Sequence, residues 1–578
     1  MQDINAQPEM RTLPAHRSSW SAIIVILVIA ATIRFIGLRW GLPNELHLFS
    51  YHPDEFHSLR GALALACGDL NPHFFNYGSL YLYLVGFASL FFAGGPGALI
   101  TVERLPALLQ QWTLIGREVT LIAALLTVLT VYFLAREIAG HRQGLIAAGL
   151  CAIFPIHVLH SHYATVDVTQ ALFTTLALFF AVRAYRAPSR RNYILAGLAV
   201  GLAASAKYSG AVAIAAPLTA FLLTLPRDSK DRLSTVYLLW LLVSAAGAFA
   251  TTSPYTFLDW QHAQKDILYE IQHMRVGEGP ALAADPNGYW FHLVNLAMTT
   301  TGGAILALFG GWAFLRDDRY RGPALIIIIF AIIWLVMIGQ SGVRYMRYEI
   351  PLVPLVAVLA AAAPLLLWRT LPEIKLIGVL ALMVVFGASA YHSYLLDREL
   401  IRPDSRDHML WLIAEYVPMH ETVATIWEPW FHGPPLDYVN GGTVLRQNPL
   451  WQTFSRDARP HLALGLNPEA LREAKPWAVI YSNFEIRDSL RIGEKSAQEF
   501  VQLLAEDYRK VVSEASRAPL YGWCGWQPPQ DWLYPFPQLT LWVSKQGVAN
   551  ARTPAVEAIR PKPGPSSEDS DNETDTAQ

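Results

Sequence analysis

The segment Pro323-Ala-Leu-Ile-Ile-Ile-Ile-Phe-Ala-Ile-Ile-Trp-Leu-Val-Met-Ile-Gly-Gln340 carries no charged side chain. A helix needs about 20 mostly apolar residues to cross the hydrocarbon core of a bilayer. The segment is therefore predicted to be a membrane-spanning helix.

Runs of the same kind recur along the first 400 residues. The chain is 53% hydrophobic and 16% charged, against roughly 25% charged in soluble proteins. The predicted spans are 20–38, 117–138, 143–160, 165–184, 192–207, 209–225, 235–254, 291–316, 323–340, 350–370 and 375–395. The pattern predicts an α-helical polytopic membrane protein with about eleven spanning helices over 20–395.

The distribution of Lys and Arg predicts the orientation, because these residues are enriched in cytoplasmic connections. With residues 1–19 in the cytoplasm, every inner connection is basic, and the short outer connections carry almost no positive charge. The outer loops are then 39–116 and 255–290. We expect a multi-pass protein of the plasma (inner) membrane with a cytoplasmic N-terminus.

The apolar stretch 78–94 has two interpretations. As a further span it would place most of the later basic connections on the wrong face. It carries Tyr81, Tyr83, Phe87, Phe91 and Phe92, and aromatic residues favour the membrane interface. We predict a helix in the outer leaflet, with an ordinary span as the alternative.

Beyond residue 400 the pattern changes to that of a soluble domain. Residues 405–416 and 497–509 are predicted helices, and 422–427, 477–481 and 538–543 are predicted strands. We expect an extracytoplasmic α/β domain over 400–546. Residues 547–578, rich in polar and charged residues beyond Pro561, are predicted to be disordered. The formal net charge of −2 gives no reason to expect nucleic acid as a partner.

Two adjacent carboxylates follow the first span, in Tyr51-His52-Pro53-Asp54-Glu55. Pro53 suits the first turn of a helix. An apolar stripe after it, formed by Phe56, Leu59, Leu63, Ala66 and Leu70, predicts a helix lying flat on the membrane. The carboxylates are candidate catalytic groups near the headgroups, or they only complement the helix dipole.

Asp167 lies at the mouth of the predicted span 165–184. An ionisable group at the edge of a span is a functional candidate by default. The alternative is a helix cap, since Thr165 and Asp167 both suit the start of a helix.

Lys207, Arg344 and Arg347 are the basic residues that break the charge rule, because they lie in short outer connections. Lys and Arg pair well with phosphate oxygens, so a lipid phosphate would hold them there. Snorkelling towards ordinary headgroups is the alternative. Cations of this kind stabilise a leaving lipid phosphate, and a carboxylate on the same face accepts the proton of an attacking hydroxyl.

In these pieces the sequence resembles the membrane-embedded, lipid-linked glycosyltransferases of the GT-C fold. It is most similar to the family of protein O-mannosyltransferases and bacterial aminoarabinose transferases. The matching pieces are Asp54-Glu55, the segment Asn71–Tyr77, Gly140-His141-Arg142, Asp167, the segment Gly197–Tyr208, and Arg344-Tyr345 with Pro351 and Pro354. The start of the outer domain, Asp404-Ser405-Arg406, also resembles that of some bacterial members.

The resemblance implies a sugar transfer from a polyprenyl-phosphate donor to an extracytoplasmic acceptor, with inversion at the anomeric carbon. It implies Asp54 as base, Glu55 as its neighbour and Asp167 as second acid, with Lys207 at the lipid phosphate. We extend the phosphate site to Arg344, Tyr345 and Arg347. Neither a cofactor nor a metal is predicted.

The chain departs from the family pattern at Asn76-Tyr77-Gly78-Ser79, where several members have a lysine and a proline pair. The departure leaves open which sugar is transferred, a hexose or a pentose. The acceptor also stays open between a glycolipid, a polysaccharide and a protein. A non-enzymatic lipid or polysaccharide transporter is the alternative function, although transporters often contain internal repeats and we find none here.

Overall fold

The computed structural model describes residues 18–93, 104–225, 233–277, 287–370, 375–438, 459–515, 518–521 and 526–545. The N-terminal residues 1–17 and the predicted disordered tail 547–578 lie outside the described residues.

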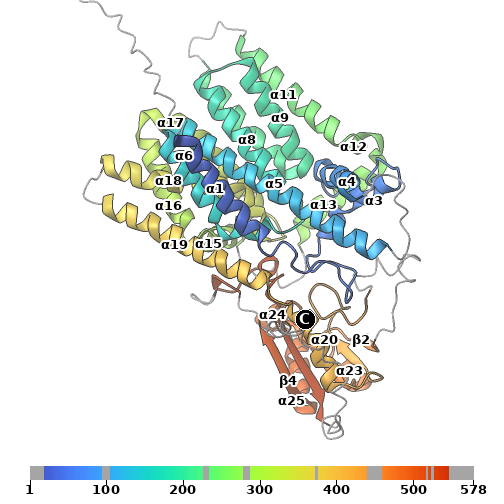
Figure 1. Ribbon diagram of the computed structural model, residues 1–578. Coiled ribbons are helices and arrows are strands. Elements are labelled where there is room, and N and C mark those ends of the chain that lie inside the picture. The colour runs from blue at the N-terminus through green and yellow to red at the C-terminus, as the bar shows by residue number, and fades with distance from the viewer. Residues whose placement is uncertain are drawn as a thin grey trace, which may run out of the picture.

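Helices make up most of the chain before residue 400 (Figure 1). They are α1 (Ser18–Phe35), α2 (Glu55–Ser58), α3 (Arg60–Ala66), α4 (Leu80–Ala93), α5 (Leu105–Ala139), α6 (His141–Ile153), α7 (Pro155–His160), α8 (Val166–Arg186), α9 (Arg190–Ala206), η1 (Tyr208–Ile214), α10 (Ala215–Thr224), α11 (Leu233–Thr252), α12 (Tyr255–Leu258), α13 (Trp260–Val276), α15 (Gly288–Thr299), α16 (Gly303–Arg316), α17 (Asp318–Gly339), η2 (Met346–Leu352), α18 (Val353–Thr370) and α19 (Lys375–Leu400).

One large core lies between these helices, and small side chains let them approach closely. In α18 the side chains of Ala360, Ala361, Ala362 and Ala363 are all fully buried. They pack in the same core as buried residues of α5, α6 and α8. An alanine-rich helix surface therefore forms the centre of the helical part.

Six helices among the described residues are long and apolar enough to cross a membrane, or seven if the bent pair α15 and α16 is one span. They lie in α5, α8, α11, α17, the stretch Met346–Pro364, and α19. A multi-pass membrane protein is therefore confirmed. The total of about eleven spans stays a prediction.

The predicted span 291–316 is sharply bent. Its two helices, α15 and α16, meet at an angle of 100°. Gly302 at the break has a φ of +86°, a left-handed conformation that glycine adopts without steric cost. The predicted span 143–160 is also divided, into α6 and α7, because Pro155 in the first turn of α7 cannot continue the helix before it.

The flat helix predicted after Pro53 is shorter and broken. Helix α2 begins at Glu55, with Asp54 at the N-cap, and α3 ends at Ala66. Leu59 is buried while Leu63 is 38% exposed, so the predicted stripe does not face one environment. The stretch 78–94 forms α4, which packs against α3 and α5. Its depth in the membrane stays a prediction.

The chain after residue 400 contains a five-stranded sheet with the order β2-β1-β3-β5-β4. Its elements are α20 (Ser405–Tyr416), β1 (Val423–Thr425), β2 (His461–Ala463), α23 (Pro468–Ala474), β3 (Ala478–Ser482), α24 (Asn483–Arg491), α25 (Lys495–Asp507), β4 (Tyr508–Ala515), η5 (Gln530–Trp532) and β5 (Gln538–Ser544). Strands β1, β2 and β3 are parallel, and β5 runs antiparallel to both β3 and β4.

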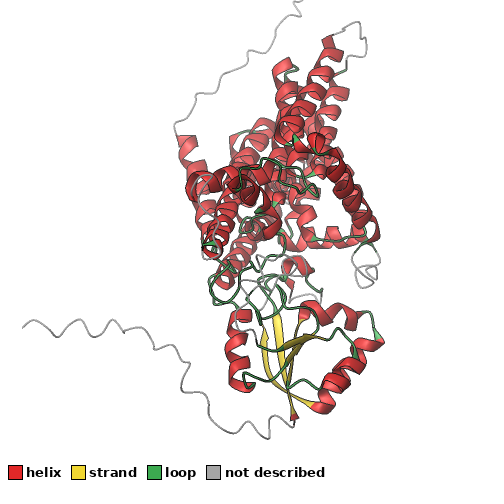
Figure 2. Cartoon of the chain, turned by 90° about the vertical axis from the view of Figure 1, so that its right-hand side faces the viewer, coloured by secondary structure: helices red, strands yellow, loops and turns green. Residues whose placement is uncertain are grey.

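Helices cover both faces of this sheet (Figure 2). Alternate side chains of β3 point to opposite faces, as in any strand. Ile480 packs with Met409 and Ile413 of α20, whereas Val479 packs with Phe500 of α25. The predicted α/β character of this region is confirmed.

One bound of that prediction was wrong, and the structure adds two strands. The helix predicted to run to Arg509 ends at Asp507, because Tyr508 begins strand β4. Neither β2 nor β4 is predicted from the sequence. The exposed β2 side chains lack a buried apolar face, and β4 alternates charged with apolar residues only in part.

Candidate active site

A cavity of about 930 Å³ is lined by residues of both the helical part and the C-terminal region. The lining residues from the helical part include Asp54, Lys207, Tyr345 and Arg347. The predicted site residues therefore converge from the first loop, the end of α9 and the segment before α18. We take this cavity as the candidate active site.

Asp54 forms an ion pair with Arg347, and both residues line the cavity. Although Asp54 occupies the N-cap of α2, its carboxylate makes no capping hydrogen bond and instead accepts one from Arg347 Nη1. The side chains are 24% and 10% exposed. The pair is thus open to the cavity.

Neighbouring groups fix the positions of both partners. Burial lowers the pKa of His52 to about 3, so this histidine is neutral and its Nδ1 accepts the backbone N–H of Asp54. The Arg347 guanidinium lies 4.3 Å from the centre of the Tyr345 ring. The backbone N–H of Arg347 donates to the Asp531 carboxylate at 2.9 Å. Asp531 belongs to η5, so the C-terminal region helps to hold Arg347.

Asp167 forms a second ion pair, with Lys207. Lys207 Nζ donates to the Asp167 carboxylate at 2.8 Å, and the side chains are 17% and 5% exposed. Thr165 is the N-cap of α8 but makes no side-chain capping bond. Lys207 lines the cavity while Asp167 lies behind it, and this arrangement suits a carboxylate that orients the lysine.

Glu55 has quite different surroundings from Asp54. Its Oε1 accepts from Arg117 Nε at 2.7 Å and from the Ala164 N–H at 2.7 Å. Its Oε2 accepts from Arg117 Nη2 at 2.8 Å and from the Ser50 hydroxyl. Burial by itself raises the pKa of Glu55, but the charge and hydrogen bonds of Arg117, together with the hydrogen bond from the Ala164 N–H, hold the pKa below its usual range.

This pair is fully buried and does not line the cavity. Arg117 also donates to the carbonyl oxygens of Leu38 and Trp40. Glu55 and Arg117 therefore connect the first loop to α5. Among the other predicted residues, Tyr345 lines the cavity, whereas Arg344 is half-buried and does not.

The segment that departs from the family pattern lies beside Lys207. The Lys207 Nζ is 5.8 Å from the centre of the Tyr77 ring and 4.8 Å from that of Tyr348. A Cβ on Gly78 would come within 2.2 Å of the Ser205 carbonyl oxygen. Only glycine allows this close backbone approach, which places Tyr77 next to the lysine.

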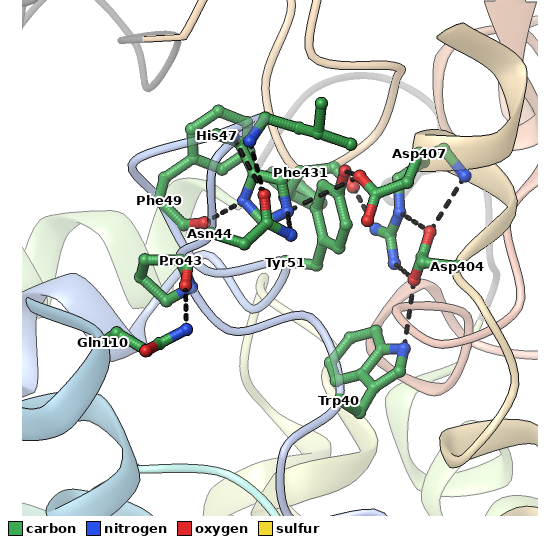
Figure 3. A network of polar contacts seen from close by, with 12 residues as sticks. Trp40, Pro43, Asn44, His47, Phe49, Tyr51, Gln110, Asp404, Asp407 and Phe431 are labelled. Atoms are coloured by element: carbon green, nitrogen blue, oxygen red, sulfur yellow. Dashed lines mark hydrogen bonds and ion pairs between the residues drawn. The ribbon is translucent and has the colours of Figure 1, made fainter. Parts of the chain in front are cut away.

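The first loop is docked onto the C-terminal region by a polar network (Figure 3). Tyr51 donates its hydroxyl to Asp407, and Trp40 Nε1 donates to Asp404 at 3.1 Å. The guanidinium of the fully buried Arg406 lies 3.7 Å from the centre of the Tyr51 ring and donates to Asp404. The loop that carries Asp54 is therefore fixed from both sides.

The predicted site does not include several other residues that line the cavity. They are Gln170, Glu270, Trp427, Trp430, Phe431, Gln530 and Tyr534. Two tryptophans within the loop segment Trp427-Glu-Pro-Trp430-Phe431 are a usable signal, because large aromatic residues in loops are often binding residues. Among the described residues, no group of three or more His, Cys, Asp or Glu side chains could hold a metal ion.

Residues 107–256 match the family of dolichyl-phosphate-mannose-protein mannosyltransferases. The matched segment contains Asp167 and Lys207. The match confirms the predicted resemblance to the protein O-mannosyltransferase type of membrane glycosyltransferase. No curated protein matches the chain.

Solved structures with a similar arrangement include the oligosaccharyltransferase of Archaeoglobus fulgidus in complex with an inhibitory peptide and a dolichol-phosphate. It is 14% identical with a TM-score of 0.46, over 86% of this chain and 73% of the other. ArnT of Cupriavidus metallidurans bound to undecaprenyl phosphate is 16% identical with a TM-score of 0.48, over 93% of this chain and 100% of the other. The protein O-mannosyltransferase complex of S. cerevisiae bound to the sugar donor is 18% identical with a TM-score of 0.34, over 44% and 35%.

Proposed function

We propose that this chain is a membrane glycosyltransferase that transfers a hexose or pentose from a polyprenyl-phosphate donor to an acceptor outside the cytoplasm. The matched family supports a lipid-linked donor. The observation that carries the proposal is the cavity, in which Asp54 pairs with Arg347 while Lys207 lines the same space, and both cations suit a phosphate.

Lys207 and Arg347 are the proposed ligands of the donor phosphate. A lysine provides a point charge and an arginine a two-pronged donor, so together they cover several phosphate oxygens. Arg347 is paired with Asp54 in the free protein. A bound phosphate competes for this guanidinium and releases the Asp54 carboxylate, so that donor binding prepares the base.

The chemical step is a single displacement. The acceptor oxygen attacks the anomeric carbon while the bond from that carbon to the phosphate oxygen breaks, which inverts the configuration. Asp54 takes the proton of the acceptor hydroxyl. The electron pair of the broken bond leaves on the lipid phosphate, whose charge Lys207 and Arg347 stabilise. Asp167 orients Lys207, and Glu55 positions the loop.

The proposal includes the orientation expected from the charge distribution. Residues 1–19 lie in the cytoplasm and residues 400–546 on the opposite side of the plasma membrane. A transporter would use the cations, but it has no use for a carboxylate that one of those cations holds at the cavity. We therefore favour the enzyme.

The test is the variant Asp54→Asn, assayed with labelled polyprenyl-phosphate sugars. Loss of a general base costs about 100- to 10,000-fold in rate. The matched control is Asp69→Asn, which removes an exposed carboxylate of the same outer loop.

The orientation is tested separately in cells, with a phosphatase that works only in the periplasm fused after Val543.

Turnover of Asp54→Asn at the wild-type rate would refute the proposed base. An enzyme that turns over no donor of the panel would contradict the transferase itself. An inactive phosphatase fusion would overturn the orientation.

A further inference from the structure

Aromatic side chains of the C-terminal region form one side of the cavity. They are Trp427, Trp430, Phe431 and Tyr534, called the aromatic wall below. The ring centres of Trp430 and Phe431 are 4.9 Å apart, and those of Phe431 and Tyr534 are 5.5 Å apart. Trp427 is 44% exposed, so part of its ring surface is free to contact a ligand.

The wall is held in place by buried charged groups. Arg406 donates to the carbonyl oxygens of Phe431 and Tyr534, the latter at 2.9 Å. The buried Glu485 carboxylate accepts the backbone N–H of Trp427 at 2.9 Å. Because these groups fix the backbone at both ends of the wall, the rings are ordered before any ligand binds, and this lowers the entropic cost of binding.

Hydrogen-bonding side chains line the same cavity. Asn76, Glu270 and Gln530 all line it. Aromatic surface together with a few amide and carboxylate groups is the usual composition of a small-molecule site. A sugar ring matches this composition, because it has an apolar face of C–H groups and a rim of hydroxyls that donate and accept.

The wall and the cations come from different parts of the chain. Lys207 and Arg347 belong to the helical part, where the polyprenyl tail of a donor must stay in the membrane. The wall belongs to the region that contains the sheet. A ligand on the wall therefore contacts the C-terminal region, whereas a donor phosphate on the two cations contacts the helical part.

We infer that the aromatic wall binds a sugar ring of the acceptor, so that the acceptor is a glycan, free or in a glycolipid or polysaccharide, and not a peptide. This inference rests on the proposed function, because it assigns the donor to the cations. It adds the class of the second substrate and the residues that recognise it.

The experiment measures binding of simple glycosides to the full chain in nanodiscs by saturation-transfer NMR. The probes are methyl α-D-mannopyranoside, methyl β-D-glucopyranoside and a short serine- and threonine-containing peptide. We expect saturation of ring C–H protons in the wild type. An aromatic contact worth about 1.4 kcal/mol is a tenfold change in affinity, so Trp427→Ala and Trp430→Ala should each weaken binding about tenfold.

Trp411→Ala is the matched control. Trp411 lies on α20 of the same region, is 46% exposed and does not line the cavity. Its variant should bind the glycosides as the wild type does. Trp427→Phe, which keeps an aromatic ring, should retain most of the binding and shows that a loss in Trp427→Ala is not caused by misfolding.

Competition by two lipids and binding of the peptide distinguish the possible ligands of the aromatic wall. Undecaprenyl phosphate and undecaprenyl-phosphate mannose should both leave the glycoside signal in place, because the acceptor position is separate. Displacement by the sugar-linked lipid alone would assign the wall to the donor sugar and overturn the inference. Saturation of the peptide in place of the glycosides, or no glycoside signal at millimolar concentration, would overturn it as well.

The Asp54→Asn variant distinguishes the two proposals. It should lose transfer and keep the glycoside signal. Wall variants that bind glycosides normally would refute the glycan acceptor while leaving the transferase intact. Transfer by Asp54→Asn at the wild-type rate would refute the proposed base, whatever the wall binds.

Discussion

Asp54 and Glu55 are neighbours in the chain, and each forms an ion pair with an arginine that is distant in sequence. The Glu55–Arg117 pair is fully buried, and four hydrogen bonds, from Arg117, Ala164 and Ser50, reach its carboxylate. The Asp54–Arg347 pair is partly exposed and faces a cavity. A saturated, buried pair holds structure, whereas a pair open to a cavity can exchange its partner for a substrate.

The largest expected effect follows from breaking the buried pair. Removing one partner leaves the other charge buried and uncompensated, which costs about 3–5 kcal/mol. Glu55→Gln should therefore lower the free energy of unfolding by about that amount, measured by thermal unfolding of the detergent-solubilised protein. Asp54→Asn should lower the free energy of unfolding less, because the Arg347 side chain that it leaves unpaired borders the cavity and is partly exposed.

Equal losses of stability in Glu55→Gln and Asp54→Asn would remove the distinction between the two pairs. A stable Glu55→Gln variant without transfer activity would assign Glu55 to the chemistry instead.

Asp531 sharpens the comparison because it is a buried carboxylate that is not paired with an arginine side chain. Its Oδ2 accepts the Arg347 N–H, and its Oδ1 has no partner among the described residues. Burial raises the pKa of Asp531 from 3.8 to about 6. As the pH rises, the Asp531 carboxyl therefore loses its proton at a lower pH in the unfolded chain than in the folded chain.

The stability contributed by Asp531 is complete below the unfolded pKa and falls as the pH rises to about 6, by about 3 kcal/mol in total. The stability contributed by Glu55 has the opposite pH dependence. It is lost as the pH falls, because the pKa of Glu55 is lowered in the folded chain. Asp531→Asn should lack the loss that occurs as the pH rises, so its unfolding temperature should rise relative to that of the wild type as the pH increases from about 4 to about 6. A constant difference between the two proteins over this range would contradict the shift.

The smallest effect is expected on the cavity side, where single charges act on the donor. Lys207→Gln should lower kcat/KM for the lipid donor. The corresponding loss of transition-state stabilisation should be about 1.5–3 kcal/mol, the value of one charge-assisted hydrogen bond. It should also weaken competition by free polyprenyl phosphate. Arg344→Gln is the comparison variant, because Arg344 does not line the cavity.

A Lys207→Gln variant with wild-type donor kinetics would mean that the cation only snorkels. An equal loss in Arg344→Gln would bring Arg344 into the phosphate site, as the sequence predicts.

Much of the architecture follows from the sequence by itself. Long runs without charge predict helices of membrane length, and alternating short runs predict the α/β region after residue 400. Both depend on local periodicity and hydropathy, which neighbouring residues set among themselves. The positions of Asp54, Asp167 and Lys207 as candidates also follow, because a charge beside an apolar run is conspicuous anywhere in a chain.

The resemblance already assigns the base to Asp54, but only the tertiary structure gives the physical difference between Asp54 and Glu55. Their difference depends on Arg347, which is 293 residues away from Asp54, and on Arg117, which is 62 residues away from Glu55. Long-range packing decides which side chain is buried and which faces the cavity, and neighbouring residues carry no record of it.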